Sequence, residues 1–282
     1  MISQPFKSIG IGATFSPNLK ANLYEASRLS LFFNCRLVLI HVGDKTTEKV
    51  EGFNEILQPF HEKGLNYELV FQPGDPVEVI LSVCDSKQIE LLILGALKKE
   101  SFYKYYVGSI ARRITRKAKC SVLLLINPSV ERIQCKHIVV SGLDDAKTTK
   151  AIETSFYIGQ QLNAEQLTIV EEITEQEIAI KVDDDKSLRM ANLAKERIRI
   201  RETSRVKKII DKIDGEIRSN IRVNSQPIFG PRGYSIGHYA QVARADLLVL
   251  PAQSKLSFWD RLFPHDVEHI LTELPTDVLI LQ

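Results

Sequence analysis

The fold of this chain is decided by residues 91–126, which read LLILGALKKESFYKYYVGSIARRITRKAKCSVLLLI. One apolar run ends at Gly95, a loop follows, Gly108 and Ser109 open a segment of helical length, and a second apolar run ends the stretch. Continuous apolar runs separated by helix-length segments are typical of parallel strands that are buried on both faces. The stretch therefore predicts a strand, loop, helix and strand of an α/β protein.

The chain carries this unit twice. Residues 74–125 align without a gap to residues 230–281, an offset of 156, whereas Ile9 aligns to Ile138, an offset of 129. The difference, 156 − 129 = 27 residues, is a net insertion in the second half. Self-similarity on this scale decides architecture before any single motif does.

The repeat predicts two α/β sandwiches in tandem, each built on a five-stranded parallel sheet of Rossmann type. The predicted domains are residues 1–128 and 136–282, and the second contains a charged insertion at about 171–205. The predicted strands are SIGIGA, RLVLIHV, YELVFQ, LLILGA and SVLLLI in the first half, and HIVVSG, QLTIVEE, IRVNSQP, DLLVLPA and DVLILQ in the second.

Composition excludes several classes of protein. The 37 basic and 35 acidic side chains leave a formal charge of +2, so no global field favours nucleic acid or a membrane as partner. The first residues lack the features of a signal peptide, and no apolar run approaches the ~20 residues of a membrane span. We therefore expect a cytoplasmic protein that binds neither nucleic acid nor membrane.

No metal or catalytic centre is predicted. The four cysteines lack CxxC spacing, so we expect them to be buried apolar side chains. His265 and His269 are spaced like a pair of helical metal ligands, but the sequence offers only the distant His238 as a third ligand. No nucleophile and base are paired at a strand end, which leaves the catalytic set empty.

The ends of the strands carry a motif. The spacing Gly, two residues, Gly, nine residues, Gly, then Ser or Thr, together with this order of elements, resembles the universal stress protein family in its tandem form. The first half keeps Gly95, Gly108 and Ser109 and has Lys98 at the second glycine position. Glycines allow close approach of the backbone to phosphate oxygens, and a Gly-Ser pair opening a helix directs free N–H groups at an anion.

The resemblance implies an adenine nucleotide, ATP with Mg²⁺, in the first half. Phosphates would lie on the motif residues, the adenine against Val42, and the sugar edge on the turn after the first strand, where Thr14 replaces the acidic residue of the family. Thr14 binds the two hydroxyls of a ribose less well than a carboxylate does. The implied binding residues are Gly12, Ala13, Thr14, Val42, Gly95, Lys98, Gly108, Ser109 and Ile110.

The second half departs from the motif. Pro251, Ser254, Pro264 and His265 occupy its four positions, and proline lacks the N–H group that would contact a phosphate. Leu143 stands at the position of the acidic residue, with Asp144 next to it. We expect no nucleotide in this half.

Two further segments lie outside the motif. In the insertion, Val206, Ile209, Ile210, Ile213 and Ile217 recur at helical spacing and predict an amphipathic helix, preceded by a mobile or extended excursion over residues 183–201. A basic site of Arg197, Arg199 and Arg201 is the alternative to a solvated surface. The aromatic residues of SFYKYYVGS and SFWDRLFPH predict packing between lobes or subunits rather than stacking on nucleic acid.

The last strand of each half, SVLLLI and DVLILQ, is apolar throughout and ends its sheet. Unpaired apolar edge strands pair readily, so we expect the halves to form an intramolecular pseudo-dimer through these strands, joined by the linker at 127–136, with a homodimer as an open alternative. The resemblance implies a non-enzymatic stress-response sensor or scaffold. Two alternatives remain: a ligand-free interaction protein that keeps only the fold, and an ATP-hydrolysing enzyme.

Overall fold

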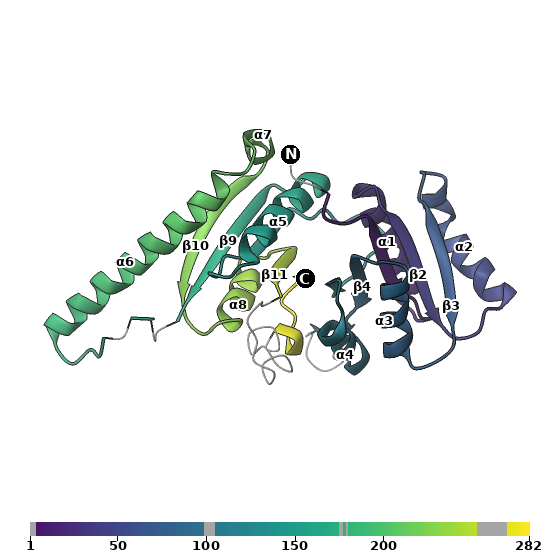
Figure 1. Cartoon of the computed structure of the whole chain (residues 1–282), viewed down its shortest axis with the longest axis horizontal. Coiled ribbons are helices and arrows are strands. Elements are labelled where there is room, and N and C mark those ends of the chain that lie inside the picture. The colour runs from purple at the N-terminus through teal and green to yellow at the C-terminus, as the bar shows by residue number, and fades with distance from the viewer. Residues whose placement is uncertain (1–3, 99–104, 175–176, 179, 253–269) are drawn as a thin grey trace. The chain divides into compact units, whose positions relative to one another are not determined.

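The computed structural model describes residues 4–98, 105–174, 177–178, 180–252 and 270–282 (Figure 1). Strands and helices alternate along both halves of the chain, as predicted. The strands are β1 (Ser8–Gly12), β2 (Arg36–Val42), β3 (Tyr67–Gln72), β4 (Leu91–Gly95), β5 (Leu97–Lys98), β6 (Tyr105–Tyr106), β7 (Ser121–Leu125), β8 (His137–Ser141), β9 (Gln166–Ile173), β10 (Arg222–Phe229), β11 (Leu247–Pro251) and β12 (Asp277–Leu281). The helices are α1 (Leu19–Phe32), α2 (Thr47–His61), α3 (Pro76–Ser86), α4 (Ser109–Lys117), α5 (Thr148–Leu162), α6 (Asp185–Ile210), α7 (Gly215–Ser219) and α8 (Tyr234–Val242).

The chain forms two compact units. The N-terminal unit contains Ser3–Gln134 together with Leu271–Gln282, and the C-terminal unit contains Cys135–Ile270. The predicted α/β class with a mostly parallel sheet is confirmed. The described strands do not divide five and five between the units, because β12 lies in the N-terminal unit.

In the N-terminal unit the strand order is β12-β7-β4-β1-β2-β3, and all neighbours except β12 and β7 are parallel. The order runs from β1 outward in both directions. Right-handed crossovers then place α1 and α2 on one face of the sheet and α3 and α4 on the other. The packing of α1 on α2 and of α3 on α4 agrees with these two layers.

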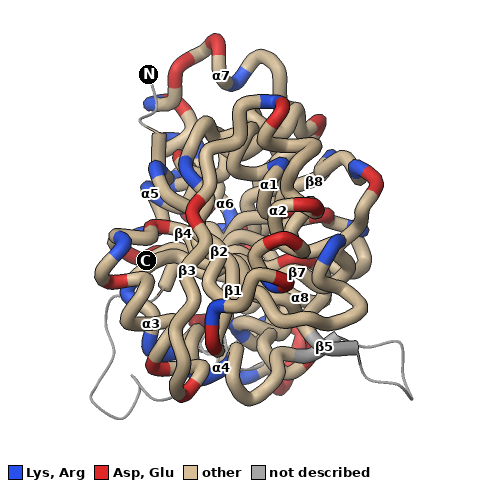
Figure 2. The backbone as a smooth tube through the Cα atoms, turned by 90° about the vertical axis from the view of Figure 1, so that its right-hand side faces the viewer, with Lys and Arg blue, Asp and Glu red and all other residues tan. Residues whose placement is uncertain are grey.

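In the C-terminal unit the order is β10-β9-β8-β11, with parallel pairing throughout. Buried apolar residues fill the strands of both units; Leu39 and Val140, for example, are fully buried. Figure 2 shows that charged residues of the backbone trace gather on helices, loops and strand ends, which agrees with apolar strands at the centre of each sheet. No helix in the described part of the chain is long and apolar enough to cross a membrane.

The predicted pairing of the two last strands is confirmed. β12 runs antiparallel to β7, with Val278 opposite Leu124 and Ile280 opposite Val122. The side-chain carboxylate of Asp277 accepts a hydrogen bond of 2.8 Å from the Ile126 N–H at one end of this ladder. The broader expectation of a pseudo-dimer stays a prediction, as do the predicted domain boundaries 1–128 and 136–282.

The prediction that residues 183–201 are extended is wrong, and the alternative that they are mobile stays a prediction. One helix, α6, runs for 26 residues from Asp185 to Ile210. Asp184 begins it with a capping box, in which its carboxylate accepts a hydrogen bond of 2.7 Å from the Ser187 N–H. The dense charge of this segment obscured its helical character, although its Arg, Lys, Leu, Met and Ala residues all favour helix.

Candidate functional site

Three of the predicted site residues end neighbouring strands at one edge of the N-terminal sheet. Gly12 ends β1, Val42 ends β2 and Gly95 ends β4, and β1 lies between the other two strands. The strand order reverses direction at β1 and β4. In open parallel sheets this switch point, at the carboxyl ends of the strands, is where ligands bind.

The turn after β1 offers less to a ligand than the sequence indicates. The Ala13 N–H donates to the Ile40 carbonyl at 2.9 Å, and its own carbonyl lies 3.0 Å from His41 Nδ1. Its side chain is buried. Both backbone groups of Ala13 are thus satisfied inside the protein, whereas Thr14 is exposed and free to meet a ligand.

An aromatic cluster of Phe15, His41, Phe53 and Phe71 lies beside this turn. Phe15 stacks on Phe53 with ring centroids 4.8 Å apart and meets His41 edge-on at 5.5 Å. The Phe15 ring is 52% exposed although it follows directly after Thr14. Sequence reasoning missed this cluster; a histidine at the end of an otherwise apolar strand was the available signal.

Gly95 also has a packing role. A Cβ at this position would lie 3.3 Å from both Oδ1 and Nδ2 of Asn22, a residue of α1. Asn22 Oδ1 is buried and has no hydrogen-bond partner among the described residues. If the Asn22 side chain rotated, a hydrogen-bond donor of a ligand at the end of β4 would satisfy that oxygen. Asn22 is therefore a candidate binding residue that the motif did not include.

The amino end of α4 begins at a residue without a side-chain cap. Gly108 is the N-cap residue, with extended backbone and no side-chain cap, and the first intrahelical bond runs from Arg112 N–H to its carbonyl at 2.9 Å. Ser109 and Ile110 are exposed in the first turn. Because α4 returns from the end of β4 to the start of β7, its positive end lies at the carboxyl edge of the sheet, where it favours an anion.

Lys98 takes a strand conformation. It pairs with Tyr105, and Leu97 pairs with Tyr106, in the short antiparallel ladder of β5 and β6. The loop of the motif is therefore closed at its base by a hairpin. The rest of the aromatic segment, residues 99–104, lies outside the described residues.

The corresponding edge of the C-terminal unit is built differently. The Gly142 N–H donates to the Val170 carbonyl at 2.8 Å, as the Ala13 N–H does to Ile40. The donor residues Ala13 and Gly142 differ by 142 − 13 = 129 positions, and the acceptor residues Ile40 and Val170 differ by 170 − 40 = 130. The C-terminal unit therefore has one residue more between donor and acceptor. Glu171 therefore corresponds to His41, and Glu172 to Val42.

Charged side chains cover this second edge. Arg205 of α6 donates a hydrogen bond to the Gly142 carbonyl and another, of 2.9 Å, to Glu202 Oε2. Glu171 accepts from Ser225 Oγ at 2.7 Å, while its other oxygen is buried without a described partner. We call Glu171, Glu202, Arg205 and Ser225 the charged cluster.

The electrostatics of this cluster differ between its two carboxylates. Burial raises the pKa of Glu171, and the hydrogen bond from Ser225 and the charge of Arg205 only partly offset it. Burial also acts to raise the pKa of Glu202, but hydrogen bonds from Arg205 and Arg201 outweigh it and hold that pKa below its usual value. Glu202 is thus the ionised partner of the arginines.

The remaining motif positions of this unit give no phosphate cradle in the described residues. Glu172 accepts a hydrogen bond of 2.8 Å from the Ile236 N–H and so binds the first turn of α8. Pro251 ends β11, Leu143 is half-buried, and Asp144 lies 4.0 Å from Arg205. The positions Ser254, Pro264 and His265, and the pair partner His269, lie outside the described residues.

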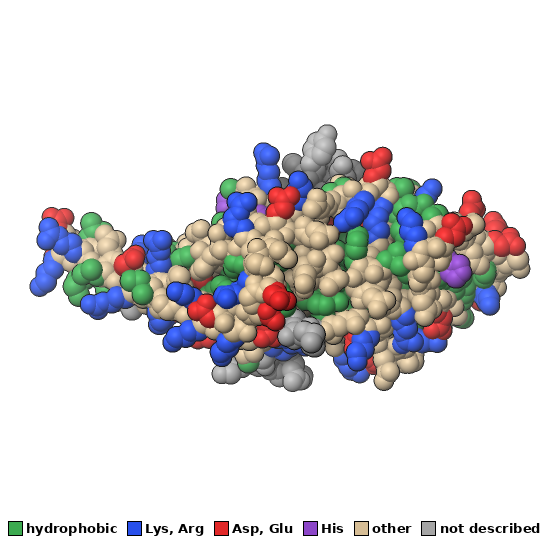
Figure 3. All heavy atoms as spheres, turned by 90° about the horizontal axis from the view of Figure 1, so that it is seen from above, with side chains coloured by type: hydrophobic (Ala, Val, Ile, Leu, Met, Phe, Trp, Pro, Cys, Tyr) green, Lys and Arg blue, Asp and Glu red, His purple; other side chains and the backbone are tan. Residues whose placement is uncertain are grey.

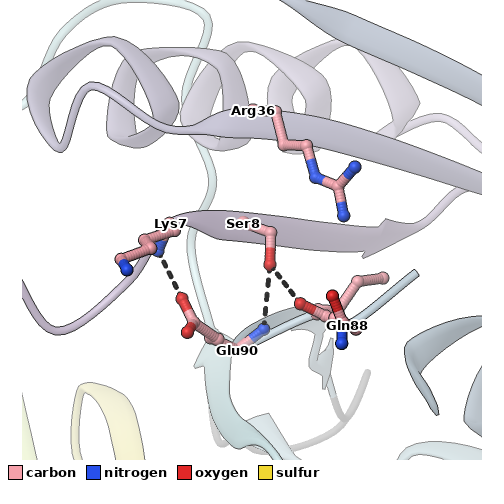
Figure 4. Close-up of a pocket in the computed structure, with 6 residues that line it drawn as sticks. Lys7, Ser8, Arg36, Gln88 and Glu90 are labelled. Carbon is pink, nitrogen blue, oxygen red and sulfur yellow. Dashed lines mark hydrogen bonds between the residues drawn. The ribbon is translucent and has the colours of Figure 1, made fainter. Parts of the chain in front are cut away.

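A cavity of about 620 Å³ opens at the opposite edge of the N-terminal sheet, where β1, β2 and β4 begin (Figure 4). The Lys7 N–H donates to the Glu90 carboxylate, and Ser8 Oγ donates to the Gln88 carbonyl at 2.5 Å. Arg36 also lines it. The cavity is therefore distinct from the predicted site. The described residues contain no cluster of three His, Cys, Asp or Glu side chains that could hold a metal.

Known proteins resemble this chain in sequence and in fold. Residues 47–125 match the model of the universal stress protein family. The universal stress protein MJ0531 of Methanocaldococcus jannaschii is 25% identical over 84 residues, which are 30% of this chain and 49% of that protein. The chain thus spans about half the length of this curated relative.

Solved structures agree over the whole chain. A universal stress protein from Archaeoglobus fulgidus superposes with a TM-score of 0.67 at 17% identity, covering 98% of each chain. PA1789 of Pseudomonas aeruginosa, described as functionally unknown, gives a TM-score of 0.70 at 15% identity over 99% of this chain and 93% of that one. At such identities the superpositions establish the fold alone, and the match of residues 47–125 adds a likeness in sequence to the universal stress protein family over that segment.

Proposed function

We propose that the N-terminal unit binds one adenine nucleotide, ATP with Mg²⁺, and that the protein is a non-enzymatic stress-response sensor or scaffold of the cytoplasm. The observation that carries this proposal is the uncapped amino end of α4 at the switch point of the sheet. The N-cap residue Gly108 has no side chain to cap the first-turn N–H groups, and the helix dipole favours negative charge at that end.

Each predicted residue has a role in this proposal. The backbone of Gly108 and Ser109 and the Ser109 hydroxyl would hold phosphate oxygens, with Ile110 in the same turn. Val42 would contact the adenine, and Thr14 the sugar edge. Mg²⁺ would offset the phosphate charge, and Lys98 would add a cation near the phosphates. Because Thr14 stands in place of a carboxylate, we expect an affinity in the micromolar range or weaker, about −8 kcal/mol or less in magnitude.

The charged cluster supports a single nucleotide per chain. In the C-terminal unit, Arg205 contacts the carbonyl of Gly142 at the edge where the sugar would lie in the other unit. Glu172 stands where Val42 would contact adenine, and its carboxylate is engaged with α8. A nucleotide would have to displace these contacts, so we expect none to bind there.

Two features favour the ligand-free scaffold as the second candidate. The backbone groups of Ala13 are satisfied within the protein, and Asn22 packs against Gly95. The Ala13 turn is therefore complete without a ligand, and the Asn22 side chain occupies the space beside Gly95. An ATP-hydrolysing enzyme would in addition have to release ADP or AMP, which the same experiment can detect.

Isothermal titration of the full chain with Mg-ATP tests the proposal. We expect saturable binding of one nucleotide per chain, without release of ADP or AMP. Ser109→Asp puts a negative charge at the amino end of α4 and should weaken binding at least ~10-fold. Ser219→Asp, at an exposed serine of the C-terminal unit, is the matched control and should bind normally.

Lys98→Gly restores the family motif and should tighten binding if the geometry of the loop limits it. Failure to bind Mg-ATP at millimolar concentration would establish the scaffold in place of the nucleotide protein. Two nucleotides per chain would contradict the role given to the charged cluster.

A further inference from the structure

Helix α6 has no part in the proposed nucleotide site, and it is strongly cationic. Its sequence, DKSLRMANLAKERIRIRETSRVKKII, contains nine Lys or Arg and three Asp or Glu residues, a net charge of 9 − 3 = +6. The rest of the chain carries 37 − 9 = 28 basic and 35 − 3 = 32 acidic residues, a net charge of −4. The positive charge of the protein is thus concentrated on one helix.

Exposed apolar side chains gather on the same helix. Met190 is 51% exposed, Leu193 is 55% exposed and Ile200 is 57% exposed. With Arg197 they follow the spacing of 3, 4 and 3 residues that places side chains on one helical face. Of the eleven large apolar residues that are exposed in the described part of the chain, five lie between Val182 and Ile200.

The cations of this face differ in their partners from the cations on the packed side of α6. Arg201 and Arg205 bind Glu202, on the side of α6 that packs on its own unit. Among the described residues, by contrast, no ion pair involves the exposed cations of the opposite side. We call that side the α6 outer face; it consists of Lys186, Arg189, Met190, Leu193, Arg197, Ile200 and Lys207.

The amino-terminal part of α6 is accessible to a partner. In Figure 1 it runs beyond the strands β9 and β10 of its own unit. Only Ala191, Glu202 and Val206 of the helix are buried. Figure 3 shows green apolar side chains among blue basic ones on this projecting end. A partner could therefore contact the outer face along most of its length.

We propose that the α6 outer face binds an acidic amphipathic helix of a partner protein. Apolar residues at heptad-like spacing are what one helix presents to another, and they supply the contact area. The flanking cations select carboxylates on the partner and speed association. This interaction is independent of nucleotide binding and goes beyond the proposed function.

The same features disfavour other occupants. A second copy bound through this face would set two helices of charge +6 against each other. A membrane-surface helix needs a broad apolar face, whereas Arg197 interrupts this one between Leu193 and Ile200. Nucleic acid would use the cations but would leave three apolar side chains without a role.

The test uses the full chain and a labelled synthetic peptide of four heptads, with Leu at positions a and d and Glu at e and g. We expect saturable binding that weakens as salt rises. Leu193→Ser with Ile200→Ser should weaken it at least ~10-fold. Ile133→Ser with Val242→Ser changes two equally exposed apolar residues elsewhere and is the matched control.

All four substituted positions are exposed, so circular dichroism and thermal melting should show unchanged folding. Four results would each overturn the proposal: no binding of the Glu peptide, equal binding of a version with Lys in place of Glu, equal loss in the control variant, or tighter binding to phosphatidylserine-containing vesicles or to duplex DNA than to the peptide.

Discussion

At the carboxyl edges of the two sheets, equivalent backbone carbonyls are paired with side chains of different chemistry. In each unit the first strand ends in a buried carbonyl that needs a donor. His41, at the end of the neighbouring strand, is placed for that role at Ala13, while Arg205, from an inserted helix, serves Gly142. The first edge is covered by aromatic rings and the second by charges. The two units of the repeat therefore share the need for a donor to this carbonyl but not the residue that supplies it.

The difference has an energetic side. The aromatic cluster packs rings against one another, with Phe15 stacked on Phe53. The charged cluster has to offset the desolvation of Glu171 and Glu202 with hydrogen bonds from Ser225 and Arg205. The polar groups of the second edge are thus engaged with one another, whereas the first edge is lined mainly by rings.

The largest expected effect is on the charged cluster. Arg205→Met removes the donor to Gly142 and leaves Glu202, which is 8% exposed, with less compensation for its charge. We expect the free energy of unfolding of the full chain to fall by about 2–4 kcal/mol, measured by urea denaturation. Arg199→Met, at an exposed position of the same helix, should change it by less than ~0.5 kcal/mol.

Adding Glu202→Gln to Arg205→Met should recover part of the loss, since the amide needs no counter-charge. An Arg205→Met protein as stable as the parent would show that the cluster is not what holds the second edge.

A smaller effect is expected at the aromatic edge. His41→Leu keeps most of the buried volume but leaves the Ala13 carbonyl without its donor, which should cost about 1–3 kcal/mol of unfolding free energy. His61→Leu is the control, because its contact with the Leu65 carbonyl is longer, at 3.4 Å, and only partly buried. A loss at His61 equal to that at His41 would remove the distinction between the two histidines.

The smallest effect concerns the amino edges, where His137 of β8 corresponds to Ser8 of β1. Burial lowers the pKa of His137 below 6.5, although the Ala243 carbonyl and the charge of Asp246 oppose it. The unfolded chain therefore binds the proton more tightly, so this contribution to stability is complete above 6.5 and declines as pH falls through the folded pKa.

His137→Ser makes the second edge like the first and should flatten the dependence of stability on pH between about 5 and 7, by less than ~1 kcal/mol. Thermal melting at several pH values measures it. An unchanged pH profile would place the proton uptake elsewhere.

Local patterns predicted most of this fold. Runs such as LVLIHV and LLVLPA formed buried strands because nothing but a parallel sheet suits short, continuous apolar segments between helices. The amino-terminal part of α6, residues 185–201, escaped prediction because a capping box and helix-forming residues mark it rather than a clean apolar stripe. Charge density alone was a poor guide to disorder there.

The candidate sites were harder to predict. The motif indicates Gly108 and Ser109 because the role proposed for them depends on local backbone, whereas Asn22 and Phe15 reach the first edge through packing between elements distant in sequence. Arg205 lies 63 residues from its acceptor, Gly142. One residue is added after Asn163, which like Asn34 has a left-handed backbone. Glu171 therefore takes the position in the repeat that corresponds to His41, and no ungapped alignment reveals this.

The place of β12 in the N-terminal unit has a consequence for synthesis on the ribosome. β7 ends at Leu125 and its partner begins at Asp277, so roughly 150 residues are made between the two strands. At about 5–20 residues per second, the apolar edge of β7 waits some 8–30 s for its partner. During that interval the nascent chain exposes a strand able to pair with another copy, and we expect chaperones to engage it there.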